Sequence, residues 1–74
     1  MASVITSKQF DPQRLRRARE RLRWSPMALA VASGLHYSVV TRIEREGRAS
    51  LTNLIKLADA LGVTIDDLLS ETAT

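Results

Sequence analysis

The sequence contains no cysteine, one histidine and three aromatic residues among its 74 positions. Without cysteine the chain forms no disulfide bond and offers no thiolate to a metal ion. A single histidine, His36, does not make a zinc site by itself. The chain also lacks the converging nucleophile, base or metal ligands that catalysis requires. We therefore expect neither an enzyme nor a bound cofactor.

Long apolar runs are also missing. The longest stretch without charge, residues 24–41, is interrupted by Pro26, Gly34 and several polar residues, so it does not suit a bilayer span. The N-terminus has neither the basic start nor the apolar run of a signal peptide. The absence of cysteine fits a reducing compartment. These features predict a cytoplasmic protein with no membrane partner.

Charge is present in quantity but unevenly distributed. Residues 8–48 carry ten basic residues against four acidic ones, a net charge of +6, whereas residues 49–74 carry one basic residue against four acidic ones, a net charge of −3. A polyanion would be attracted to the first part and repelled by the second. A chain of this length folds as one small domain that buries only about 60% of its unfolded surface, so a partner subunit would add stability.

Helix start and stop signals divide the chain into short helices. Asp11 and Ser25 each place a side-chain acceptor before a proline, which is typical of a helix start. The predicted helices cover residues 12–22, 26–33, 37–45, 51–61 and 65–70. No segment alternates with period two over the length of a strand, so the predicted fold is all-α, with five helices around one core. We assign residues 1–10 to an N-terminal arm, 11–70 to the domain and 71–74 to a C-terminal tail.

Residues 25–45 form the pattern of a helix-turn-helix, two short helices joined at Gly34. The chain resembles the XRE-type superfamily of DNA-binding domains, which includes the phage repressors and Cro, over residues 12–70. The resemblance rests on Ser25, Leu29, Ala30, Gly34, Leu35, Val40 and Glu44. It implies a lambda-repressor-like domain similar to small regulators of bacteria and phages, such as restriction–modification controllers.

In this family the third helix enters the major groove and its early residues contact bases. The resemblance therefore implies base-reading roles for Tyr37, Ser38 and Arg42, with His36, Val39 and Thr41 at the margin. Arg42 has the best chemistry for the role, because its planar guanidinium matches the two acceptors on the edge of guanine.

Phosphate contacts are expected on either side of the reading residues. Arg45 and Arg48 follow the third helix, where family members bind the DNA backbone. Arg17 and Arg23 are further candidates among the arginines of the first predicted helix and the turn after it. Contacts of this kind set the affinity and the register on the duplex but carry no sequence preference.

Two structural roles complete the predicted set. The resemblance places Arg19 opposite Glu44, where the family often has a partly buried ion pair that ties the first helix to the third. Apolar residues near the C-terminus exceed what a core needs, and in similar proteins the last helix pairs the subunits. This predicts a dimer interface at Ile65, Leu68 and Leu69.

These features favour a sequence-specific, double-stranded DNA-binding transcriptional regulator that acts as a homodimer on a palindromic operator. The alternative is a protein-interaction module or antitoxin with the same fold, suggested by the apolar residues Met27 and Val31 on the second helix. RNA polymerase or a toxin remains open as a further partner.

Overall fold

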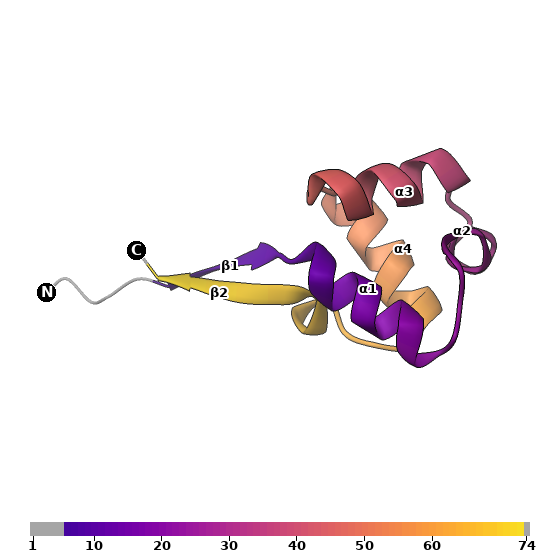
Figure 1. The fold of residues 1–74 in the computed structure, drawn as a ribbon. Helices are drawn as coiled ribbons and strands as arrows, with labels where there is room; N and C mark the ends of the chain where they lie inside the picture. The colour runs from indigo at the N-terminus through magenta and orange to yellow at the C-terminus, as the bar shows by residue number, and fades with distance from the viewer. Residues whose placement is uncertain (1–5, 74) are drawn as a thin grey trace, which may run out of the picture.

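A computed structural model describes residues 6–73 of the chain. Four helices form the body, and two strands from opposite ends of the sequence form a ribbon that projects from it (Figure 1). The elements in chain order are β1 (Thr6–Phe10), α1 (Pro12–Arg21), α2 (Pro26–Ser33), α3 (Tyr37–Glu46), α4 (Leu51–Leu61), the 3-10 turn η1 (Asp66–Leu68) and β2 (Leu69–Ala73). The four helices expected between residues 12 and 61 are confirmed, each to within about a residue.

Side-chain oxygens cap three of the four helices at their N-termini. Asp11 accepts a hydrogen bond from the backbone N–H of Gln13 at 2.9 Å. Ser25 and Ser50 each accept one from the N–H three positions later, at 3.1 Å. These bonds satisfy backbone donors that the first turn of a helix leaves without a partner. Three helices end in a left-handed residue at Gly34, Gly47 and Gly62.

The prediction of a fifth helix over residues 65–70 is wrong. Thr64 and Asp67 do form a reciprocal helix cap, with bonds of 3.0 and 3.1 Å between each backbone N–H and the other side chain. The helical turn nevertheless ends at Leu68, and Leu69 is extended (φ −110°, ψ 147°) because it begins β2. Pairing with a distant strand therefore replaces the local helical continuation.

β1 and β2 form a two-stranded antiparallel sheet in which Lys8 lies opposite Glu71 and Phe10 opposite Leu69. Residues 6–10 of the predicted arm and 71–73 of the predicted tail are thus strand residues. The rest of the arm, residues 1–5, and Thr74 lie outside the described residues. The all-α prediction is corrected by this ribbon.

The core lies where the four helices and η1 meet. Its largest fully buried side chains are Leu15, Leu29, Val40, Ile43, Leu57 and Leu68. Trp24 and Phe10 are partly buried against this cluster. Leu68 has no exposed surface, so its prediction as a dimer contact is corrected: it packs inside its own chain and presents nothing to a second subunit.

Candidate nucleic-acid interface

Helix α3 has one buried face and one exposed face. Val40, Ile43 and Glu44 are buried, while Tyr37, Ser38 and Arg42 are exposed. With 3.6 residues per turn, residues one position apart or four positions apart lie on the same half of a helix. The three expected base-reading residues are therefore brought together on the outer face of α3.

The three marginal candidates lie differently. Val39 is partly buried against the core, so little of it reaches the outer face. Thr41 is half-buried, and its hydroxyl donates to the carbonyl of Ser38 at 3.1 Å. His36 is exposed at the N-cap of α3 but makes no capping bond through its side chain. Of these, only His36 is fully available to a ligand.

The C-terminal end of α3 carries exposed positive charge. Arg45 is exposed and its Nη2 lies 3.7 Å from Oε2 of Glu46, a loose surface pair that constrains it little. Arg48 is exposed and lines a shallow hollow between the end of α3 and the start of α4, together with Arg42 and Asn53. The base-reading candidate Arg42 and the phosphate candidate Arg48 thus border the same hollow.

Arg23 has a left-handed backbone (φ 60°) although it has a side chain. It ends α1: its N–H donates to the carbonyl of Glu20 at 2.9 Å, and the next N–H, of Trp24, donates to the carbonyl of Arg19 at 3.1 Å. Glycine is the usual residue at this position because a Cβ costs roughly 1–2 kcal/mol there. The Arg23 side chain is exposed just before the N-terminus of α2.

Arg17 lies on the side of α1 that faces away from α3. It lines a hollow with Arg14, Arg21 and Asp67, between α1 and the segment that follows α4. In an α-helix, residue 17 points roughly 130° away from the mean direction of residues 16 and 19, and the side chains of Arg16 and Arg19 both reach Glu44 of α3. Arg17 is therefore not placed with the outer face of α3, and we do not retain it among the phosphate contacts.

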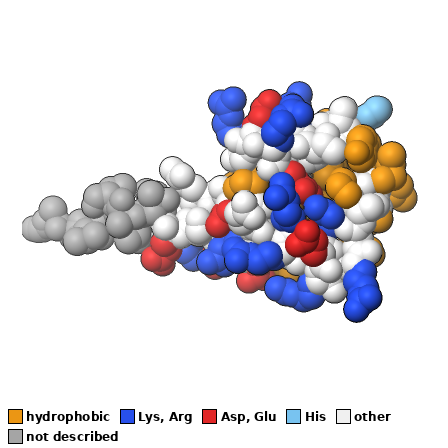
Figure 2. Space-filling view, in the orientation of Figure 1, with side chains coloured by type: hydrophobic (Ala, Val, Ile, Leu, Met, Phe, Trp, Pro, Cys, Tyr) orange, Lys and Arg blue, Asp and Glu red, His pale blue; other side chains and the backbone are white. Residues whose placement is uncertain are grey.

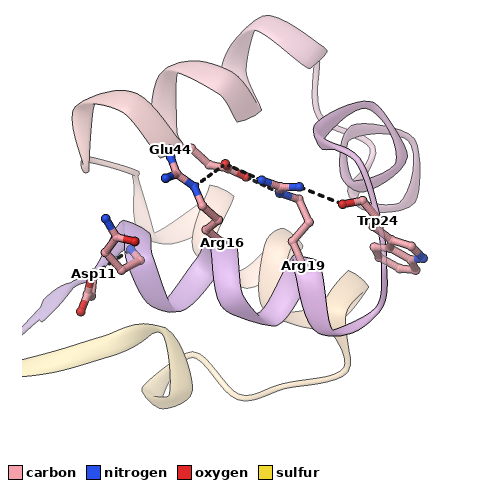
Figure 3. Close-up of polar contacts among 6 residues, drawn as sticks. Asp11, Arg16, Arg19, Trp24 and Glu44 are labelled. Carbon is pink, nitrogen blue, oxygen red and sulfur yellow. Dashed lines mark hydrogen bonds and ion pairs between the residues drawn. The ribbon is translucent and has the colours of Figure 1, made fainter.

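Arg19 and Glu44 are the buried polar pair among the described residues. Arg19 Nε donates to Glu44 Oε2 at 2.8 Å and Nη2 donates to Oε1 at 3.0 Å, so the guanidinium binds both carboxylate oxygens (Figure 3). The third nitrogen, Nη1, donates to the backbone carbonyl of Trp24 at 2.8 Å. One side chain therefore fixes α1, α3 and the turn that leads into α2.

A second arginine, not predicted from the sequence, belongs to this cluster. Arg16 Nε lies 3.5 Å from Oε1 of Glu44, and the Arg16 side chain is about half exposed (Figure 3). The signal was available, because residues 16 and 19 are one helical turn apart and share a face of α1.

A patch of apolar side chains lies at the end of the body that carries α2 (Figure 2). Met27 and Val31 of α2 are 52% and 76% exposed, and Tyr37 at the start of α3 is 46% exposed. No charged residue occurs between positions 24 and 41. The outer face of α3 is thus bordered by an uncharged surface on its N-terminal side and by arginines on its C-terminal side.

The arrangement of α2 and α3, two short helices joined by a left-handed glycine with one exposed polar face, defines a helix-turn-helix. The helix-turn-helix family model HTH_3 matches residues 15–68. The chain belongs to this family, and it is a DNA-binding transcriptional regulator of the XRE type.

Two solved structures are similar to this chain. The restriction–modification controller protein C.AhdI from Aeromonas hydrophila is 43% identical, with a TM-score of 0.72 over 77% of this chain and 88% of that one. The N-terminal DNA-binding domain of SinR from Bacillus subtilis is 29% identical, with a TM-score of 0.73 over 77% of this chain and 86% of that one. A search of curated protein sequences finds no match. Within residues 6–73, none of the helices combines the length and the apolar character needed to cross a membrane.

Proposed function

We propose that the protein binds specific double-stranded DNA sequences as a homodimer, with α3 in the major groove of each half-site. The observation that carries the proposal is the outer face of α3, where Tyr37, Ser38 and Arg42 are exposed together while the opposite face is held in the core. An α-helix fits the major groove, and the exposed groups are of the kinds that distinguish base edges.

Each exposed residue has a distinct role in this proposal. Arg42 donates two hydrogen bonds to the N7 and O6 acceptors of a guanine, a contact worth about 1–3 kcal/mol of discrimination. Ser38 is short and lets a base edge approach closely, and it can bond to several bases. Tyr37 offers a hydroxyl and a ring that can pack on a thymine methyl group. His36 is a marginal contact at the start of the helix.

Phosphates are bound on both sides of the reading face. Arg45 and Arg48 hold one strand near the C-terminal end of α3, and Arg23 holds the backbone near the start of α2. The exposure of all three side chains supports these roles. Their contribution is electrostatic and falls steeply with salt, because each contact releases counterions.

A homodimer would read a palindrome, since a two-fold axis relating the subunits also relates the half-sites. The similarity to a restriction–modification controller and to the DNA-binding domain of SinR supports a role in controlling transcription. Occupancy of such a site near a promoter would change access of polymerase to it.

The experiment that tests the proposal is selection of bound duplexes from a randomised DNA pool at near-physiological salt, followed by sequencing. We expect an enriched palindrome whose half-site centres lie about 10 base pairs apart. Salt-sensitive binding without any enriched sequence would contradict the proposal, because it would reduce the basic surface to an electrostatic contact.

The apolar patch of Met27, Val31 and Tyr37 favours a second candidate function, binding of a protein partner such as a toxin or polymerase. Exposed apolar area of this kind commonly marks protein contacts. A Met27→Ser, Val31→Ser double variant that loses a defined partner while keeping the selected DNA site would support it. Loss of DNA binding alone would assign the patch to the duplex.

A further inference from the structure

The ribbon of β1 and β2 is joined to the body at its base, and within residues 6–73 no helix packs along its length. The N–H of Asp11 donates to the carbonyl of Leu68 at 2.9 Å, and Lys8 Nζ lies 2.6 Å from Oδ1 of Asp66. Beyond this base the ribbon projects away from the helices (Figure 1), and neither strand makes an extended contact with any of the four helices. The ribbon therefore has two sheet edges that nothing in the described chain pairs.

A ribbon with these properties is unusual in an isolated subunit. Two strands alone are marginally stable in water, and an unpaired strand edge is a template for another strand. Natural edges are commonly blocked by several charges, by proline or by a bulge. Here the described strands carry one charge each, Lys8 and Glu71, and these lie directly opposite one another in the ladder.

The register identifies which backbone groups are free. Opposite residues in an antiparallel ladder alternate between pairs that exchange hydrogen bonds and pairs that do not. The bond from Asp11 to Leu68 belongs to one bonded pair, so Gln9 and Ser70 form the next. The backbone N–H and C=O of Lys8 and Glu71 then point outward, toward the unpaired edges.

From these observations the geometry points to a second copy of this chain as the partner that pairs with the edge of the ribbon. The ribbons of the two subunits lie side by side and antiparallel. Like strands pair with each other, and the two ribbons together form a four-stranded sheet. Pairing β1 with β1, or β2 with β2, creates a closed two-fold interface, whereas pairing β1 with β2 of another copy would repeat without end. The inference rests on the homodimer of the proposed function and names its interface.

The dimensions of the ribbon agree with those of a DNA-bound dimer. Five residues of antiparallel strand span about 17 Å, so fully overlapped ribbons would hold the two bodies about that far apart. Helix α3 lies along the top of the body and its last turn is on the side from which the ribbon projects (Figure 1). Ten helical residues span about 15 Å, which places the middle of each α3 roughly 8 Å further out. The two reading helices would then be about 33 Å apart, close to the roughly 34 Å between adjacent half-sites.

Two proline variants of the full chain test the interface. Glu71→Pro and Lys8→Pro each remove one outward N–H and no hydrogen bond within the ribbon, and Glu71→Ala and Lys8→Ala are the matched controls that keep that N–H. Because the interface is two-fold, a proline at the paired edge removes two symmetry-related hydrogen bonds from the dimer. We therefore expect one of the two prolines to weaken the dimerisation affinity on the order of tenfold to a hundredfold relative to its alanine control. Sedimentation equilibrium measures this, with circular dichroism as the check on helix content. Dimerisation of both proline variants at the strength of their alanine controls would overturn the inference, as would a wild-type chain that stays monomeric.

Hydrogen exchange on the wild-type protein provides a second test of the interface, and this test does not depend on the folding of any variant. The amide of Lys8 or of Glu71 should become protected as protein concentration rises through the dimerisation range. Unprotected exchange of both amides in a protein that is dimeric would overturn the inference.

Binding to a palindrome and to a single half-site separates this inference from the proposed function. A proline variant that binds a half-site normally but loses tight binding to the palindrome supports both. A wild-type dimer that selects a palindrome while both proline variants bind it as tightly as their controls retains the function and overturns the ribbon interface. A wild-type chain that dimerises through the ribbon yet selects no DNA sequence retains the interface and overturns the function.

Discussion

Two hydrogen bonds join Arg19 to the backbone of Trp24, one at its N–H and one at its carbonyl. The Trp24 N–H donates to the Arg19 carbonyl at 3.1 Å, and Arg19 Nη1 donates to the Trp24 carbonyl at 2.8 Å. The same guanidinium binds both carboxylate oxygens of Glu44 on α3. The turn before α2 and the body of α3 are therefore positioned by a single side chain, which fixes the two helices of the helix-turn-helix relative to each other.

Removal of the Glu44 carboxylate should damage folding. Glu44→Ala leaves the buried Arg19 guanidinium without its charge partner, and breaking a buried pair on one side costs about 3–5 kcal/mol. Urea unfolding followed by circular dichroism measures the loss. Arg16→Ala is the matched control: that side chain is about half exposed and its contact with Glu44 is longer, so its loss should cost about 1 kcal/mol or less. Equal costs for the two variants would contradict the assigned role of Arg19.

Arg42→Ala should remove base preference without affecting the fold. Its side chain is exposed and forms no ion pair within the described residues, so the unfolding transition should stay unchanged. Affinity for the selected site should fall by about 1–3 kcal/mol, while affinity for a scrambled duplex should change little. Competition binding with the two duplexes distinguishes the outcomes. An equal loss on both would make Arg42 a phosphate contact.

Arg23→Gly should stabilise the protein while weakening its binding to DNA. Glycine relieves the left-handed backbone at this position, a gain of about 1 kcal/mol in the free energy of unfolding. Loss of the guanidinium removes one phosphate contact, which should lower the slope of log affinity against log salt by about 0.9. Denaturant unfolding and a salt titration of DNA affinity measure the two effects.

Two further variants separate the backbone of Arg23 from its side chain. Arg23→Ala should lose the same DNA affinity without the gain in stability, because alanine keeps the strained Cβ. Arg17→Ala should leave DNA affinity unchanged, since Arg17 lies on the side of α1 away from α3. A decrease with Arg17→Ala equal to that with Arg23→Ala would contradict the placement of Arg17 away from the DNA.

Gly47→Ala should destabilise more than Gly34→Ala. Both glycines are left-handed, with φ of 73° and 74°, so both substitutions carry backbone strain of roughly 1–2 kcal/mol. At Gly47 an added Cβ would also lie 3.3 Å from Cγ of Pro12, whereas at Gly34 it meets nothing within 4 Å. The contact between the end of α3 and the start of α1 would have to open. Thermal unfolding of the two variants gives the comparison, and equal melting temperatures would contradict the close contact at Gly47.

Acid should destabilise the turn at η1 through Asp67. Hydrogen bonds from the backbone N–H and the hydroxyl of Thr64 hold the pKa of Asp67 below its ordinary value of 3.8, with smaller contributions from Arg14 and Arg21. A depressed pKa in the folded state means that the stabilisation is present above about pH 4 and is lost as the pH falls through the folded-state pKa. Asp67→Asn should therefore show a weaker decline in melting temperature between pH 5 and pH 2 than the wild type. The difference between the two declines measures the contribution of the Asp67 carboxylate to acid unfolding. Parallel declines in the two proteins would remove Asp67 from the acid response.

The helical body could be predicted from the sequence because its signals are local. Caps at Asp11, Ser25 and Ser50 and the left-handed glycines set the helix ends within a residue or so. The outer face of α3 also follows from helical spacing, since Val40 and Ile43 fix which side is buried.

The ribbon could not be predicted in this way, because its two strands lie at opposite ends of the chain. The segment after Thr64 carries a real helical cap, and nothing within residues 65–70 indicates that Leu69 pairs with Phe10. The same omission explains Leu68. With a fifth helix over residues 65–70, the apolar side chain of Leu68 is expected to be surplus to the core, whereas as part of η1 it is fully buried.

The pairing of Thr6 with Ala73 also bears on the order in which the protein folds. Helices form from neighbours in the chain, and the contacts of α1 with α3 and of α2 with α3 and α4 close shorter loops than the ribbon does. The ribbon instead closes a loop that contains almost every described residue, and the entropy of that closure is lost before any ladder bond is gained. The helices should assemble first, bringing the two chain ends together, and the ribbon should form last. A subunit newly released from the ribosome would thus have α3, the helix proposed to read DNA, in place before it acquires the element proposed to pair it with another.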